Sequence, residues 1–268
     1  PGVETPDSFV VLGAHLDSRG EDRGDPAERA PGADDNGSGC AAVLEFAKAV
    51  SKSRMKFKKT IRLCLFTGEE QGTWGSKALA AKWKEEDAKI DAYINLDMLG
   101  FLPPGGTAPI TFPVKDNDPA LTSIGKQIAQ TYLPSEPMIQ TDIPCCSDNG
   151  PFLDFGFSVT SIHECPQDKK FGLLPRYNSL QNKNIHSAED SLDKLNFEQL
   201  RVKSTAAAGM IALLAEPTRA AAGKPLGAKL VLPKIPGDSP TNPFSPEGLR
   251  RCREKLEPEY GKWTLNYC

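Results

Sequence analysis

Apolar positions along the chain fall into two alternating kinds of segment. Short apolar runs rich in β-branched residues indicate strands that are buried on both faces. Longer segments with apolar residues three and four positions apart indicate amphipathic helices. The predicted strands are residues 8–13, 60–66, 92–96 and 157–162. The predicted helices are residues 38–52, 74–84, 119–132 and 197–215.

This alternation of strands and helices favours an α/β fold. We predict a three-layer α/β/α sandwich around a central mixed, largely parallel sheet. Residues 1–216 are expected to form this domain, and the proline-punctuated segment 217–268 is expected to be a C-terminal extension packed on it. The first strand starts almost at the N-terminus, so we also expect preceding strands of the sheet to be missing or to lie on another chain.

Composition narrows the class of protein. The 268 residues are 39% apolar, which predicts a soluble globular protein with a sizeable core. A net charge of −3 gives no sign of a basic groove, so we expect no nucleic-acid partner. No apolar run approaches the roughly 18 residues of a membrane span, so we expect no membrane partner.

The seven cysteines are divided between two environments. Cys40 and Cys64 lie in apolar runs and are predicted to be buried thiols. Cys252 and Cys268 lie in the polar tail, where we expect them to form a disulfide. This use of cysteine favours a secreted or vacuolar protein. The remaining three, Cys145, Cys146 and Cys165, receive no assignment.

Titratable side chains follow three of the predicted strands at the point where each strand ends. His15 and Asp17 follow the first strand. Glu69 and Glu70 follow the second, and Asp97 follows the third. Ligands of open α/β sheets bind at the carboxyl ends of the strands, and crowded carboxylates need cations among them. Imidazole together with carboxylate suits zinc, and one carboxylate can bridge two ions.

Two further stretches supply candidate ligands. Asp34 and Asp35 lie between glycines directly before the predicted helix at 38–52. Alone, such a stretch indicates a turn and a helix N-cap. His186 lies in a polar loop, where a single histidine is usually only solvated. Their occurrence together with the carboxylates after the strands makes them candidate metal ligands.

Five motifs, in this order along the chain, resemble the two-zinc aminopeptidases of metallopeptidase clan MH. They are GAHLDS at 13–18, APGADDNGSG at 30–39, EEQGTWGS at 69–76, NLDM at 95–98 and HSAED at 186–190. The resemblance covers roughly residues 10–215. It implies that residues 1–216 are a zinc exopeptidase catalytic domain with two Zn²⁺ ions per chain, bound at the carboxyl ends of the strands.

Carried over by position, the resemblance assigns the metal ligands. It makes His15 and Asp97 ligands of one zinc, and Glu70 and His186 ligands of the other. Asp34 is implied to be the ligand that both ions share. The resemblance also implies that the peptide bond from Asp34 to Asp35 is cis.

The resemblance also assigns the catalytic residues. Glu69 is implied to be the general base and Asp17 the carboxylate that fixes the tautomer of the His15 imidazole. The implied reaction removes N-terminal residues from peptide substrates with a free N-terminus, by a hydroxide held between the two zinc ions. A separate N-terminal fragment of the same precursor is a further expected partner.

Some positions depart from the family pattern or allow another interpretation. Some members have a tyrosine shortly before the Ser-Asp motif at 147–148 that assists the oxyanion. None stands there in this chain, and Tyr177 is a guess for the residue with this role. His163 and Glu164 begin a thermolysin-like motif that lacks its second histidine, so His163 is expected to serve packing. Asn36 starts a glycosylation sequon that we expect to be buried and unmodified.

Three alternative functions remain open on the sequence. A carboxypeptidase on the same scaffold needs cations for the substrate carboxylate. A glutaminyl cyclase is a more distant relative with one zinc, and the intact pair of Glu69 and Glu70 together with Asp34 argues against it. A catalytically inactive binding ectodomain usually lacks a ligand or the base, and here every candidate is present. Loop cations available to a carboxypeptidase are Arg19, Lys169, Lys170 and Arg176.

Overall fold

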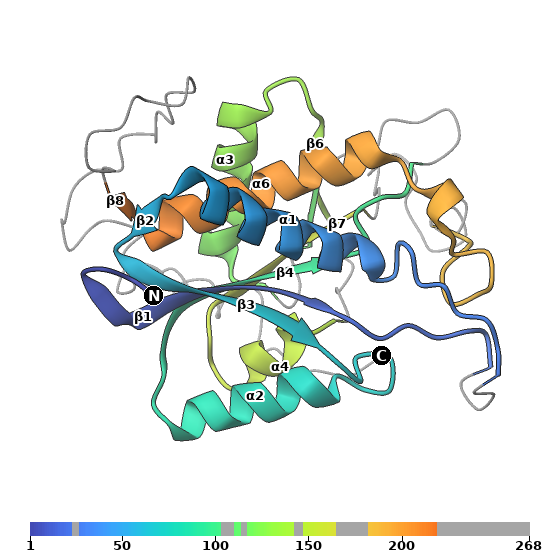
Figure 1. Ribbon diagram of the computed structural model, residues 1–268, viewed down its shortest axis with the longest axis horizontal. Coiled ribbons are helices and arrows are strands. Elements are labelled where there is room, and N and C mark those ends of the chain that lie inside the picture. Colours follow the sequence, from blue (N-terminus) through green and yellow to red (C-terminus); the bar gives the residue numbers. More distant parts are fainter. Residues whose placement is uncertain (23–26, 103–109, 114–116, 142–146, 165–181, 219–268) are drawn as a thin grey trace.

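The computed structural model describes residues 1–22, 27–102, 110–113, 117–141, 147–164 and 182–218. Within these ranges the chain forms a six-stranded sheet with helices on both faces and a separate two-stranded sheet (Figure 1). None of the helices in these ranges has the length and apolar character needed to cross a membrane.

The six-stranded sheet has the order β3-β1-β4-β7-β5-β6. Strands β3, β1, β4 and β7 run parallel to one another, and β5 runs antiparallel to β7. The predicted mixed, largely parallel sheet is therefore confirmed. The strand bounds are β1 (Thr5–His15), β3 (Lys59–Phe66), β4 (Lys89–Asp97), β5 (Ile110–Pro113), β6 (Met138–Thr141) and β7 (Val159–His163). The two-stranded sheet pairs β2 (Lys56–Phe57) with β8 (Pro217–Thr218).

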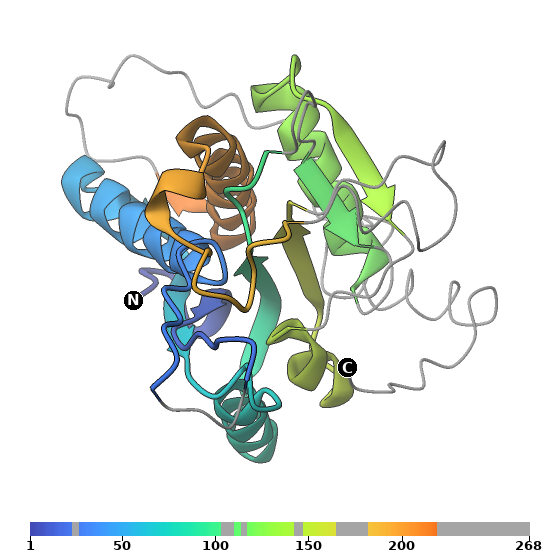
Figure 2. The same ribbon diagram turned by 90° about the vertical axis from the view of Figure 1, so that its right-hand side faces the viewer.

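Helices cover both faces of the sheet, which completes the predicted three layers. One face carries α1 (Gly37–Ser53), α3 (Pro119–Tyr132) and α6 (Phe197–Ala215). The other face carries α2 (Trp74–Glu85) and α4 (Asn149–Asp154). Figure 2 shows the two sets of helices on opposite sides of the strands. A short 3-10 helix, η2 (Leu192–Lys194), precedes α6.

Alternating side chains of β1 supply both layers of core. Val10 and Leu12 pack into the cluster beneath α1, α3 and α6. Phe9 and Val11 pack into the cluster on the face of α2 and α4. Successive side chains of a strand point to opposite faces of the sheet, so a strand buried on both faces needs apolar residues at every position. This explains why the β1 sequence is a continuous apolar run.

Phe152 of α4 lies at the centre of the aromatic cluster on the second face. It is fully buried, and its ring centroid lies 4.7 Å from that of Tyr93 and 5.8 Å from that of Trp83. We expect Phe152→Ala to lower the free energy of unfolding by about 3–5 kcal/mol, because it removes these contacts and leaves a cavity. Urea unfolding measures this change. Leu44→Ala, at a side chain 55% exposed on α1, is the control and is expected to change it by less than about 0.5 kcal/mol. Equal losses in the two variants would contradict the packing role.

All eight predicted elements are present, most of them longer than predicted. β1 and β4 extend to His15 and Asp97, so both candidate ligands are the last residues of their strands. The pattern missed the short elements β2, β5, β6, β8, α4 and η2. Cys40 is a buried free thiol, as predicted. Cys64 is free but only partly buried, which corrects its prediction, because it lies on β3 at the edge of the sheet.

Several expectations concern residues outside the described ranges. These are the packing of the C-terminal extension beyond residue 218, the proposed disulfide and the proposed oxyanion residue. The named residues concerned are Cys252, Cys268, Cys145, Cys146, Cys165, Tyr177, Lys169, Lys170 and Arg176.

Candidate metal centre

The site lies at the carboxyl ends of three adjacent parallel strands. His15 is the last residue of β1, and Asp97 is the last residue of β4. Glu69 and Glu70 follow β3 in the turn that leads to α2. Because β1 pairs in parallel with both β3 and β4, these ends meet at one edge of the sheet.

The loop before α1 places a carboxylate over this edge. The Asp190 side chain accepts hydrogen bonds from the backbone N–H groups of Asp34 and Asp35, both at 3.0 Å. Asn36 caps α1 by accepting from Gly39 N–H, and its amide donates to the Leu96 carbonyl at 2.8 Å. These contacts fix the loop to both α1 and β4.

The cis peptide bond in this loop joins Asp35 to Asn36. The prediction of a cis bond from Asp34 to Asp35 is therefore wrong by one residue. Asn36, on the far side of the observed bond, is the residue whose side chain ties the loop to the sheet.

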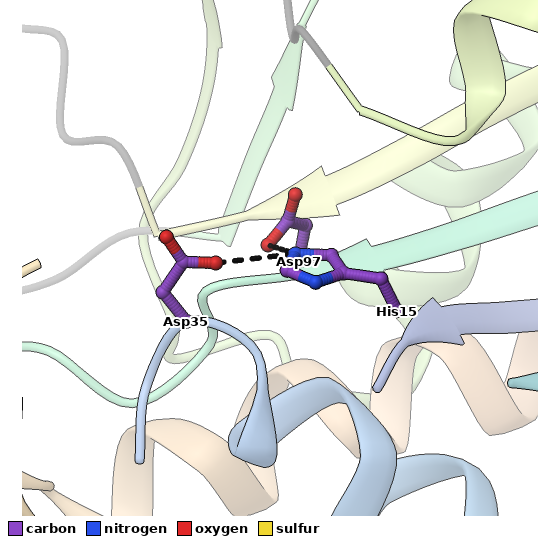
Figure 3. Close-up of side chains that lie close together, drawn as sticks. All are labelled: His15, Asp35 and Asp97. Atoms are coloured by element: carbon purple, nitrogen blue, oxygen red, sulfur yellow. Dashed lines mark ion pairs between the residues drawn. The ribbon is translucent and has the colours of Figure 1, made fainter. Parts of the chain in front are cut away.

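The first group of potential ligands is His15, Asp35 and Asp97. His15 Nε2 lies 3.1 Å from Asp35 Oδ1 and 3.4 Å from Asp97 Oδ1. Figure 3 shows both carboxylates directed at the imidazole. All three residues are buried. Burial opposes a charge on His15, but the Asp97 and Asp35 carboxylates outweigh it and raise the imidazole pKa well above its usual value.

The second group is Asp35, Glu70 and His186. His186 Nε2 lies 2.9 Å from Asp35 Oδ2 and 3.3 Å from Glu70 Oε2. Asp35 thus directs one oxygen to each imidazole. It is the residue that belongs to both groups.

Asp34 does not occupy this shared position. It is fully buried, and its oxygens accept hydrogen bonds from Gly100 N–H at 2.8 Å and from the Asn182 side-chain amide at 2.7 Å. The structure therefore does not place Asp34 in the shared position that the resemblance gave it, and Asp35 lies there instead. Adjacent residues direct their side chains differently, and in this loop Asp35 faces the histidines while Asp34 faces the loop after β4.

The ligand atoms of each group suit a zinc ion. Within each group the potential ligand atoms lie within 4.8 Å of one another. Glu70 Oε1 is buried and has no hydrogen-bond partner, a costly state that a bound cation relieves. Imidazole nitrogens with carboxylate oxygens form a donor set that zinc uses.

Glu69 lies beside the first group without belonging to either. Its Oε2 is 4.0 Å from His15 Nε2. Burial, with the nearby Asp97 carboxylate, raises the pKa of Glu69 to about 9.

The Asp17 side chain does not contact His15 in the way that the resemblance implies. His15 Nδ1 lies 3.0 Å from the backbone carbonyl of Asp17 but 3.8 Å from its carboxylate. The carbonyl therefore orients the imidazole, which corrects the role given to the Asp17 side chain. The carboxylate instead accepts hydrogen bonds from the backbone N–H groups of Glu69 and Glu70, at 3.2 and 3.1 Å.

Asp17→Asn should therefore disturb the Glu69–Glu70 turn while His15 keeps its carbonyl partner. One acceptor oxygen becomes an NH₂ group facing a backbone N–H, so we expect kcat to fall by about 10- to 100-fold. Turnover assays together with metal analysis measure this, with Asp7→Asn, an exposed position, as the control. A loss no greater than that of Asp7→Asn would refute the supporting role.

Sequence reasoning missed Asp190 and gave Arg19 no role at the metal ligands. Asp190 ends the HSAED motif, and that proximity to His186 was the available signal. Arg19 Nε donates to Glu70 Oε2 at 2.9 Å, a contact that no sequence pattern marks. His163 is the last residue of β7, paired with Asp97 in the sheet register, and belongs to neither group of ligands.

The family model for peptidase family M28 matches residues 1–211. A probable leucine aminopeptidase of Arthroderma otae is 34% identical over 221 residues, which are 80% of this chain and 55% of that protein. Leucine aminopeptidase 1 of the same organism is 31% identical, over 78% of this chain and 55% of the relative. The chain thus spans about half the length of the curated relatives it matches.

Solved structures share the fold at lower identity. The Legionella pneumophila LapA aminopeptidase has a TM-score of 0.67 at 23% identity, covering 78% of this chain and 52% of its own. BSAP, a zinc aminopeptidase from Bacillus subtilis, has a TM-score of 0.63 at 21% identity, covering 80% and 48%. A glutaminyl cyclase from an Acidobacteriales bacterium has a TM-score of 0.64 at 24% identity, covering 80% and 71%. On the family match and the relatives above 30% identity, the chain belongs to peptidase family M28.

Proposed function

We propose that the protein is a zinc-dependent aminopeptidase that hydrolyses N-terminal residues from peptides. The observation that carries this proposal is the position of Asp35, with one oxygen on each of two histidines. Membership of peptidase family M28 and the similarity to proteins named leucine aminopeptidases support the same reaction class.

Two ions per chain are proposed, one for each group of ligands. His15, Asp97 and Asp35 would hold the first, and Asp35, Glu70 and His186 would hold the second. Zinc in such a site supplies a Lewis acid for the substrate carbonyl and lowers the pKa of a water molecule.

Glu69 is proposed to move the proton. Its carboxylate takes a proton from the attacking water and passes it to the leaving amine, so the same group acts first as base and then as acid. Its position supports this role, because it faces the first group yet is not needed to hold either ion. The two hydrogen bonds from backbone N–H groups to Asp17 hold the turn that aims it.

Peptides with a free N-terminus are the proposed substrates. The buried carboxylates of the site favour a cationic ammonium group over its neutral acetylated form. A secreted or vacuolar location is proposed on the cysteine content alone.

One assay tests this function. Hydrolysis of an aminoacyl amide with a free N-terminus is compared with that of its N-acetylated form, before and after chelation and zinc restoration. We expect cleavage of the free form, little cleavage of the acetylated form, and loss on chelation that zinc reverses. Undiminished cleavage of the acetylated form would sink the aminopeptidase proposal.

A carboxypeptidase is the second candidate, because a cation does lie in the site. Arg19 reaches Glu70 and is 16% exposed at its side chain. An acetylated dipeptide with a free C-terminus, added to the same assay, separates the two reactions. Its preferred cleavage would favour the carboxypeptidase, whereas resistance is expected here, since the Arg19 guanidinium is already engaged by Glu70.

A further inference from the structure

Arg19 contacts two of the three members of the second group. Its Nε donates to Glu70 Oε2 at 2.9 Å, and a terminal nitrogen lies in close contact with His186 Nδ1. The same Glu70 oxygen lies 3.3 Å from His186 Nε2. The guanidinium therefore lies in direct contact with the second group of ligands.

The first group has a different electrostatic setting. The ion pairs recorded for His15 in the described part of the chain are all with carboxylates: Asp17, Asp35, Glu69 and Asp97. A dication at this group is surrounded by negative charge. A dication at the second group shares Glu70 with a permanent cation, because arginine does not deprotonate in proteins.

The contact with His186 places the guanidinium beside Nδ1 of a proposed ligand. Nε2 of the same imidazole faces Asp35 and Glu70, the other members of the group. A metal ion held by these three residues would therefore lie next to a permanent positive charge.

We propose that Arg19 lowers the zinc affinity of the site formed by Asp35, Glu70 and His186 below that of the site formed by His15, Asp35 and Asp97. The first group then fills first, and the second fills at a higher zinc concentration. Arg19 acts here by engaging Glu70 Oε2 and by placing its positive charge beside the ion. The inference rests on the proposed two-ion centre.

Zinc titration of the metal-free protein tests this proposal, with calorimetry or a competing chromogenic chelator as the readout. We expect two separate binding steps in the unaltered protein. Arg19→Met should tighten the second step by at least about tenfold, because it removes a like charge beside the ion, and should leave the first step unchanged. Arg19→Lys keeps the charge and should retain a weak second step. Arg29→Met, at an exposed arginine in the same loop, is the matched control.

The possible results separate this inference from the proposed function. An Arg19→Met titration that superimposes on the unaltered one, or a weaker second step, would overturn the role of Arg19. Absence of a second step in every variant would instead overturn the two-ion centre. If Arg19→Met does not fold, as judged by circular dichroism, Arg19→Gln removes the same charge and decides the outcome.

Discussion

Glu69→Gln is expected to lower kcat by about 100- to 10,000-fold while the protein keeps its zinc. The glutamine amide is similar in size to the carboxylate but cannot take a proton from water. Glu69 lies outside both groups of ligands, so its replacement leaves every ligand atom in place. Steady-state kinetics and metal analysis of the same preparation measure the two effects together.

Two companion variants make this result specific. Glu70→Gln changes a member of the second group and should lose zinc as well as activity. Glu85→Gln, at an exposed position of α2, should change neither. Loss of zinc from Glu69→Gln with retention by Glu70→Gln would show that the two glutamates have exchanged roles.

Asp35→Asn is expected to release both ions, since Asp35 is the residue common to the two groups. An amide has one neutral acceptor oxygen where the carboxylate directs a charged oxygen to each side. We expect zinc affinity to fall by more than about 100-fold, beyond the effect typical of a residue that only supports a ligand. Metal content after dialysis against a weak chelator measures this.

Asp34→Asn is the matched control for that variant. The asparagine oxygen can still accept from Gly100 N–H, so the loop keeps one of its two hydrogen bonds. Retention of zinc is the expected result, with a loss in affinity of about tenfold or less. The opposite ranking of the two variants would restore the assignment made from sequence resemblance.

The sequence predicted the sheet well because its central strands are buried on both faces. The β1 and β4 runs are apolar without interruption, and the helices that cover them have a clear helical period. The elements that escaped prediction are two to six residues long. Such short segments give too few positions for a period to stand out, and β5 ends in a proline.

The residues that the structure brings together match the candidate ligands from the sequence except at Asp34, and the reason is physical. Residues that end strands have positions fixed by the sheet, so His15 and Asp97 could be located from the strand pattern alone. The choice between Asp34 and Asp35 depends on contacts from distant parts of the chain. These are the hydrogen bonds to Asp190 and from Gly100, which adjacent sequence does not encode.

Asn36 has a consequence for how the protein can be produced. It begins an Asn-Gly-Ser sequon, yet its side chain is 2% exposed and its amide nitrogen donates to the Leu96 carbonyl. In a host that glycosylates secreted proteins, oligosaccharide transfer and folding compete for this nitrogen. A chain that is modified first cannot close the loop onto β4. Glycosylation of Asn36 in such a host would therefore lower the yield of folded protein.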